Sequence, residues 1–269
     1  CGAWANMWIK ATNEYTGKAY FDELMQYDVI DYTDAVDLHP YSWSTPEAFS
    51  MVESIKYYRD TYRNAGKTDV EVWNTELGYT TADDVANTER KQGELNQRTL
   101  LIFETEDVGD INVLYNFERK GIINYDREDS FGMVENGYDD ATVWGTRFFP
   151  REGYIMLAGH NYVMADSTND KIIESTDPDV VIYQYDSKKF DSKIVTVYDK
   201  QGNSKTVSFD LGTDKIDLYD AWGNMTELYS ESGCYTFDID SSPIYIVGDI
   251  TKVEETEKAK ESTKSINSP

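Results

Sequence analysis

Glu76 is the residue whose type and position could most directly do chemistry. It follows a short β-rich run that contains Val70, Val72 and Trp73, and it enters a loop at Gly78. A carboxylate at the end of a strand can act as a nucleophile or as a general acid or base. Because the chain has 50 Asp and Glu residues, the alternative for any single one is a solvated or capping carboxylate. The sequence context favours the catalytic reading.

A second strand end earlier in the chain carries further polar and aromatic groups. The apolar run Ala35–Leu38 is followed by His39, Pro40 and Tyr41. In parallel α/β barrels the active site lies at the carboxyl ends of the strands. We therefore expect His39 and Tyr41 to line a site with Glu76, although a lone histidine is more often a structural residue.

Composition excludes several classes of function. The 269 residues include 25 Lys and Arg, and the formal charge of −25 disfavours nucleic acid and anionic membranes as partners. Two cysteines and two histidines are too few for a disulfide framework or a His-based metal cluster, so we expect no metal and no cofactor. No apolar run approaches the roughly 18 residues that a membrane helix needs. The aromatic content of 14% suits sugar stacking and ordinary core packing equally well.

Residues 1–165 alternate helix and strand signals, which predicts a parallel α/β sheet. Thr45-Pro46-Glu47 has the features of a helix start, and the helix is expected to end at Gly66. The predicted helices are 18–27, 45–66, 88–106 and 147–164, and the predicted strands are 35–38, 70–75 and 111–117.

Beyond residue 166 the pattern changes to short alternating strands separated by turn signals such as Gln201-Gly-Asn203 and Trp222-Gly-Asn224. This pattern predicts an antiparallel β-sandwich over 166–250. The segment 251–269 is rich in Lys, Glu, Ser and Thr, which predicts a linker or disordered tail. The strands expected in the sandwich are 180–185, 193–198, 206–211, 215–219, 234–239 and 243–247.

Four motifs in this order resemble the second half of a clan A glycoside hydrolase, similar to family 39-type β-xylosidases. They are Asp37-Leu-His-Pro-Tyr41, Trp73-Asn-Thr-Glu-Leu-Gly78, Val113-Leu-Tyr-Asn-Phe117 and Phe131-Gly-Met133. The resemblance implies α/β plus all-β architecture: strands five to eight of a (β/α)8 barrel in 1–165, then the β-sandwich.

The resemblance also implies roles for individual residues. Glu76 matches the nucleophile of a retaining mechanism, and His39 and Tyr41 match residues that line the sugar site. Tyr115 and Asn116 fall at the end of strand eight, where the family contacts substrate. Trp43 and Trp144 could stack on sugar rings or serve as packing.

This sequence departs from the family pattern because strands one to four are absent. The family's acid/base glutamate should therefore precede residue 1. Asn13-Glu14 is similar to part of that motif, but Tyr15 stands where the family has proline. We interpret Glu14 as a surface carboxylate.

These observations favour a secreted or cell-surface, cofactor-independent glycoside hydrolase that acts on a plant or host glycan. The alternatives are a non-catalytic carbohydrate-binding module and a structural module of a larger protein. Expected partners are a carbohydrate substrate and either the missing N-terminal half-barrel or a second copy of the chain. An exposed barrel edge would drive that association.

Overall fold

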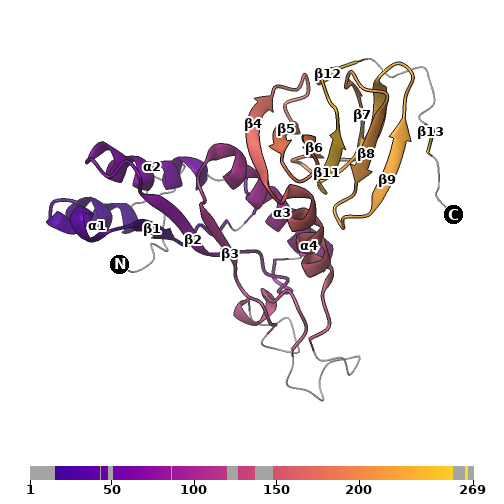
Figure 1. The fold of residues 1–269 in the computed structure, drawn as a ribbon. Coiled ribbons are helices and arrows are strands. Elements are labelled where there is room, and N and C mark those ends of the chain that lie inside the picture. The colour runs from indigo at the N-terminus through magenta and orange to yellow at the C-terminus, as the bar shows by residue number, and fades with distance from the viewer. Residues whose placement is uncertain are drawn as a thin grey trace. The chain divides into compact units, whose positions relative to one another are not determined.

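The computed structural model describes residues 16–42, 44–47, 51–85, 87–119, 127–136, 148–256 and 264–265. The chain forms two compact units, residues 1–154 and 155–269, and helix α4 (Glu152–Met164) spans the division (Figure 1). The domain boundaries expected at 165/166 and 250/251 stay predictions. None of the helices among the described residues is long and apolar enough to cross a membrane.

The first unit is built around a parallel sheet in the order β1-β2-β3. Helices follow the first two strands along the chain, as the alternating sequence pattern predicts. The elements of this unit are α1 (Thr16–Leu24), the 3₁₀ helix η1 (Asp28–Tyr32), β1 (Ala35–Leu38), α2 (Met51–Asn64), β2 (Glu71–Leu77), α3 (Glu89–Glu106), β3 (Ile111–Leu114) and the 3₁₀ helix η2 (Glu128–Ser130).

The two faces of this sheet differ in burial. Successive side chains point to opposite faces of a strand, and in β2 Val72 and Asn74 are buried. On the other face Trp73 is 37% exposed, and its register partner Ile111 and the next residue on that face, Val113, are 42% and 46% exposed. Parallel sheets are ordinarily covered on both faces. The described residues therefore leave the face that carries these three side chains incompletely covered.

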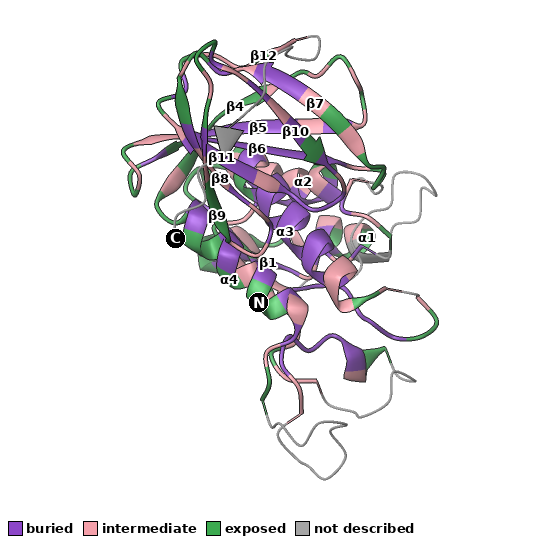
Figure 2. Cartoon of the chain, turned by 90° about the vertical axis from the view of Figure 1, so that its right-hand side faces the viewer, coloured by how far each residue is buried: buried purple, intermediate pink, exposed green. Residues whose placement is uncertain are grey.

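Helix α3 is the most deeply buried helix of the first unit (Figure 2). It begins after Thr88, whose hydroxyl accepts a hydrogen bond from the backbone N–H of Lys91 at 3.0 Å. Several of its buried residues are polar, including Gln92, Gln97 and Arg98. Buried polar groups ordinarily have hydrogen-bond partners, and those of Gln92 and Arg98 lie in the loops after the strands.

The second unit contains two antiparallel sheets, in the orders β13-β9-β8-β11-β6-β5-β4 and β10-β7-β12. Apolar side chains from both sheets, such as Val195, Ile246, Phe209 and Tyr235, form one continuous core. The strands are β4 (Ser167–Ile173), β5 (Val180–Ser187), β6 (Ser192–Asp199), β7 (Lys205–Asp210), β8 (Lys215–Tyr219), β9 (Met225–Tyr229), β10 (Cys234–Ile239), β11 (Ile244–Gly248), β12 (Glu254–Glu255) and β13 (Lys264–Ser265).

Within the second unit, α4 lies against the antiparallel strands. The buried His160 ring nitrogen Nδ1 is 3.0 Å from the hydroxyl of the buried Tyr245. A Cβ atom on Gly159 would come within 2.6 Å of the Trp222 backbone, so only glycine allows this close approach.

The segment after residue 250 adds a short strand to the smaller sheet. Strand β12 pairs with β7, and the Glu255 carboxylate accepts hydrogen bonds from Ser175 and Thr176. These contacts hold the chain against the smaller sheet as far as Thr256.

Candidate active site

Three successive parallel strands deliver the candidate residues to one edge of the sheet. Leu38, the last residue of β1, pairs with Asn74 of β2, and Leu77 at the end of β2 pairs with Leu114 at the end of β3. His39 and Tyr41 follow β1, and Tyr115 follows β3. The carboxyl ends of the three strands therefore lie together.

A β-bulge sets the orientation of Glu76. The register between β2 and β3 runs from Asn74↔Asn112 to Leu77↔Leu114, so β2 holds one extra residue across the stretch that contains Thr75 and Glu76. Such bulges redirect side chains and are frequent beside active sites. The Thr75 hydroxyl, which donates to the Asp37 carboxylate, links the bulge to β1.

Glu76 makes two contacts with the residues that follow β1. The Tyr41 hydroxyl donates to Glu76 Oε2 at 3.2 Å, and His39 Nδ1 lies 3.3 Å from the same oxygen. The Glu76 side chain is 40% exposed and that of His39 is 19% exposed. The carboxylate is thus held on one side and exposed on the other.

Tyr41 remains a hydrogen-bond donor over the whole physiological range. Burial of the ring raises the pKa of its hydroxyl well above the usual value, and the negative charge and hydrogen bond of Glu76 raise it further. A neutral tyrosine beside a carboxylate stabilises the charged form of that carboxylate.

Three aromatic rings meet next to Glu76. The Phe131 ring is 5.8 Å from that of Tyr41 and 5.4 Å from that of Tyr115, and the two tyrosine rings are 6.4 Å apart, all edge to face. The Tyr115 hydroxyl donates to Glu128 Oε2 at 3.1 Å. Phe131 and Glu128 were not among the site residues expected from the sequence. Phe131 lies in one of the quoted motifs, whereas no sequence signal marks Glu128.

The ends of β2 and β3 approach very closely. Gly78 has φ +156°, and a Cβ atom there would lie 2.5 Å from the Tyr115 carbonyl oxygen, which explains glycine at this position. The Tyr115–Asn116 peptide bond is cis. Asn116 Oδ1 accepts from the backbone N–H of Phe117 at 2.8 Å, so this side chain oxygen is engaged locally.

Buried side chains hold the loops behind the site. Gln92 Nε2 donates to the carbonyl oxygens of Tyr79 and Phe131 at 2.7 and 2.8 Å. Arg151, which is also buried, donates to the Gly132 carbonyl and, at 2.9 Å, to the Thr81 hydroxyl. These contacts join the loop after β2 to the segment 127–133.

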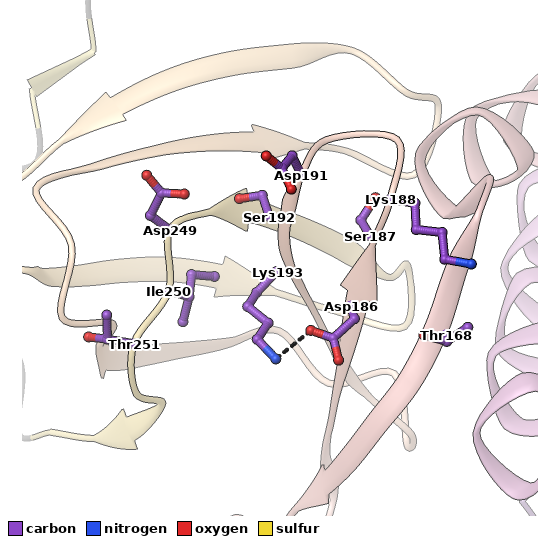
Figure 3. Close-up of a pocket in the computed structure, with 10 residues that line it drawn as sticks. All are labelled: Thr168, Asp186, Ser187, Lys188, Asp191, Ser192, Lys193, Asp249, Ile250 and Thr251. Atoms are coloured by element: carbon purple, nitrogen blue, oxygen red, sulfur yellow. Dashed lines mark ion pairs between the residues drawn. The ribbon is translucent and has the colours of Figure 1, made fainter.

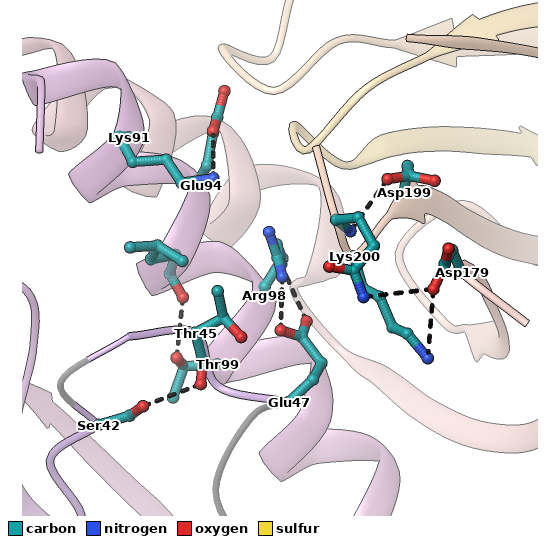
Figure 4. Close-up of polar contacts among 12 residues, drawn as sticks. Ser42, Thr45, Glu47, Lys91, Glu94, Arg98, Thr99, Asp179, Asp199 and Lys200 are labelled. Atoms are coloured by element: carbon teal, nitrogen blue, oxygen red, sulfur yellow. Dashed lines mark hydrogen bonds and ion pairs between the residues drawn. The ribbon is translucent and has the colours of Figure 1, made fainter. Parts of the chain in front are cut away.

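The loop after β1 is anchored by an ion pair with α3 (Figure 4). Arg98 is fully buried and forms two hydrogen bonds with the Glu47 carboxylate, of 2.9 and 2.5 Å. The Ser42 hydroxyl donates to the Thr45 carbonyl at 2.9 Å. Both contacts stabilise the loop that presents Tyr41.

Two expected substrate-binding residues, Trp43 and Trp144, lie outside the described residues, as does Glu14. The roles given to His39, Tyr41, Glu76, Tyr115 and Asn116 stay predictions. Within the described ranges, no group of three or more His, Cys, Asp or Glu side chains could hold a metal ion.

A separate shallow depression of about 500 Å³ lies within the second unit (Figure 3). Asp186 and Lys193 in its wall form an ion pair of 2.5 Å, and Asp191, Asp249 and Lys188 also line it.

No family model and no curated protein matches this chain, but solved structures do. A family 39 glycoside hydrolase from the gut symbiont Bacteroides cellulosilyticus WH2 superposes with a TM-score of 0.71 at 18% identity, over 86% of this chain and 47% of that chain. The fold of this chain is similar to that of about half of this glycoside hydrolase structure.

Two further glycoside hydrolase structures are similar. A glucosidase from Croceicoccus marinus has a TM-score of 0.57 at 13% identity, over 87% of this chain and 57% of that chain. A GH30 endoxylanase from Clostridium papyrosolvens C71 has a TM-score of 0.52 at 13% identity, over 84% of this chain and 52% of that chain. The chain spans about half the length of each of these three structures.

Proposed function

We propose that this chain is the nucleophile-bearing portion of a secreted, retaining glycoside hydrolase. The observation that carries the proposal is the arrangement of Glu76, Tyr41 and His39 at the carboxyl edge of a parallel sheet. A single carboxylate is held there by two polar contacts and remains open to a ligand. The similarity of the fold to glycoside hydrolases supports the proposal.

In the proposed reaction, the Glu76 carboxylate attacks the anomeric carbon of a sugar as the bond to the leaving oxygen breaks. A second carboxyl group, roughly 5–5.5 Å away in retaining enzymes, donates the proton to that oxygen. The same group then removes a proton from the water that hydrolyses the glycosyl-enzyme. The hydrogen bond from Tyr41 fixes the direction of the Glu76 oxygens.

We further propose that β1, β2 and β3 are strands six to eight of a (β/α)8 barrel. The acid/base carboxylate then belongs to the preceding half of the barrel. Two observations support this arrangement: the exposed apolar residues Trp73, Ile111 and Val113, and a chain about half as long as the similar structures.

Trapping with 2-deoxy-2-fluoro glycosides tests the proposal. The proposed full-length parent and the present chain are each incubated with a panel of glycones and analysed by intact mass and peptide mapping. We expect a covalent sugar on Glu76 of the parent, and none in Glu76→Gln. Glu71→Gln is a matched control, because Glu71 lies in the same strand and its carboxylate accepts from the Trp73 indole instead.

If no glycone forms an adduct and no natural glycan is hydrolysed, the proposal that this protein is part of an enzyme is refuted. Glycan binding that persists without turnover would favour the carbohydrate-binding alternative. An adduct on another carboxylate would refute the role of Glu76 alone.

A further inference from the structure

The segment 127–133 accepts several hydrogen bonds from donors elsewhere in the first unit. Thr80 donates to the Arg127 carbonyl at 2.8 Å, and the backbone and hydroxyl of Thr81 both donate to the Ser130 carbonyl at 3.1 Å. The next two carbonyls, those of Phe131 and Gly132, accept from Gln92 and Arg151. Three successive carbonyls are therefore fixed from outside the segment.

This segment also has no room to shift at Gly132. A Cβ atom on Gly132 would lie 2.0 Å from the backbone nitrogen of Arg119, so the two backbones are in direct contact. The backbone N–H of Arg119 donates to the Val134 carbonyl at 2.9 Å on the same side. The position of residue 131 is thus determined by buried hydrogen bonds and by a steric limit.

The side chain so fixed is that of Phe131, which is buried against both tyrosines of the site. An edge-to-face aromatic contact has a preferred geometry and resists displacement of the partner ring. A swing of the Tyr41 side chain about its Cα–Cβ bond would carry the hydroxyl away from Glu76 and break their hydrogen bond. Phe131 therefore limits the positions that the Tyr41 hydroxyl can adopt.

We propose that Phe131, held in place by Gln92, is a positioning residue that acts on Glu76 through the Tyr41 hydroxyl. This inference rests on the proposed function, since it assigns the segment 127–133 a role in that reaction. Misplacement of a reacting group by about 1 Å can cost a hundredfold in rate. A side chain that does not touch substrate can therefore control turnover.

The test is a double-mutant cycle in the proposed full-length enzyme with Phe131→Leu, Tyr41→Phe and the double variant. If Phe131 acts through the Tyr41 hydroxyl, Phe131→Leu lowers kcat about tenfold with KM within about twofold of wild type. In the Tyr41→Phe background the same change lowers kcat by less than about twofold, because the hydroxyl is already absent. We expect Gln92→Leu to lower kcat in the wild-type background as Phe131→Leu does, and to have the same small effect in the Tyr41→Phe background.

Phe103→Leu is the matched control, because Phe103 is a fully buried phenylalanine of α3. It is expected to lower stability to a similar degree while leaving kcat unchanged. A second readout does not depend on turnover. With ¹³Cζ-labelled tyrosine, the Tyr41 signal of wild type stays that of a neutral phenol at pH 11, whereas in Phe131→Leu it begins to titrate.

Equal losses of kcat from Phe131→Leu in both backgrounds would overturn this inference and leave the proposed function intact. A Tyr41 signal that is identical in wild type and Phe131→Leu would also overturn it. A wild-type enzyme that forms no adduct and hydrolyses no glycoside would overturn the proposed function, and this inference with it.

Discussion

Replacing Glu47 by glutamine should destabilise the first unit, because it leaves the Arg98 guanidinium buried without its counter-charge. Arg98 is fully buried, and its two hydrogen bonds to Glu47 measure 2.9 and 2.5 Å. Removing one partner of a buried ion pair costs about 3–5 kcal/mol. The Glu47 side chain is 17% exposed, so water can reach the pair, and we expect a loss of about 3 kcal/mol.

Hydrogen exchange of the α3 amides is the appropriate assay, because a chain of two units need not unfold in one step. A loss of about 3 kcal/mol corresponds to exchange roughly a hundredfold faster for amides that exchange through opening of this unit. Lys56→Met is the control, since it breaks a partly exposed ion pair of 2.6 Å with Glu106 and should cost less than about 1 kcal/mol.

The double variant Glu47→Gln/Arg98→Met should recover most of the lost stability, because it removes both charges from the interior. Protection factors in Glu47→Gln within twofold of wild type would refute the reasoning. Such a result would show that water stabilises the buried charge of Arg98 as well as the Glu47 carboxylate does.

Three further predictions follow from the first unit. Gly132→Ala should cost about 3 kcal/mol or more in unfolding free energy, because the new methyl group meets the Arg119 backbone; an unchanged denaturation midpoint would contradict this. Burial raises the pKa of Tyr58 to about 12, above the unfolded value near 10, so its contribution to stability is complete below pH 10 and is lost between pH 10 and 12. Between pH 10 and 12, the unfolding free energy of Tyr58→Phe should fall less steeply than that of the wild type. Equal slopes in the two proteins would contradict this role of Tyr58. The chain expressed alone should self-associate through the face that carries Trp73 and Ile111, and Trp73→Lys should weaken that association in light scattering; a monodisperse monomer would count against the half-barrel proposal.

Elements with a clear apolar period were predictable from the sequence. Strands β1, β8 and β10 have the predicted bounds, and α3 (Glu89–Glu106) begins one residue after the predicted start of the helix 88–106. Strands β4 and β9 were missed because most of their residues are exposed, so neither shows the alternation of a half-buried strand. The exposure of β4 follows from its position at the edge of the sheet, where it pairs with a neighbour on one side only.

The candidate site was predictable where it depends on strand order, and not where it depends on distant contacts. Glu76, Tyr41 and Tyr115 meet because parallel strands share an edge, which the alternating pattern implies. The contact of Gln92 with Phe131 joins residues 39 positions apart through a single side chain amide. No periodicity or local motif encodes such a contact, because it depends on how the loops fold back over α3.

Strand β12 has a practical consequence for anyone who dissects this protein. Its two residues, Glu254 and Glu255, are all that separates β7 from an open edge of the smaller sheet. A fragment that ends at residue 250, where the sequence suggests a boundary, would expose the unpaired backbone of β7. Exposed edge strands of this kind pair with strands of neighbouring molecules. We therefore expect such a fragment to precipitate or form fibres where one that keeps residues 251–256 stays in solution.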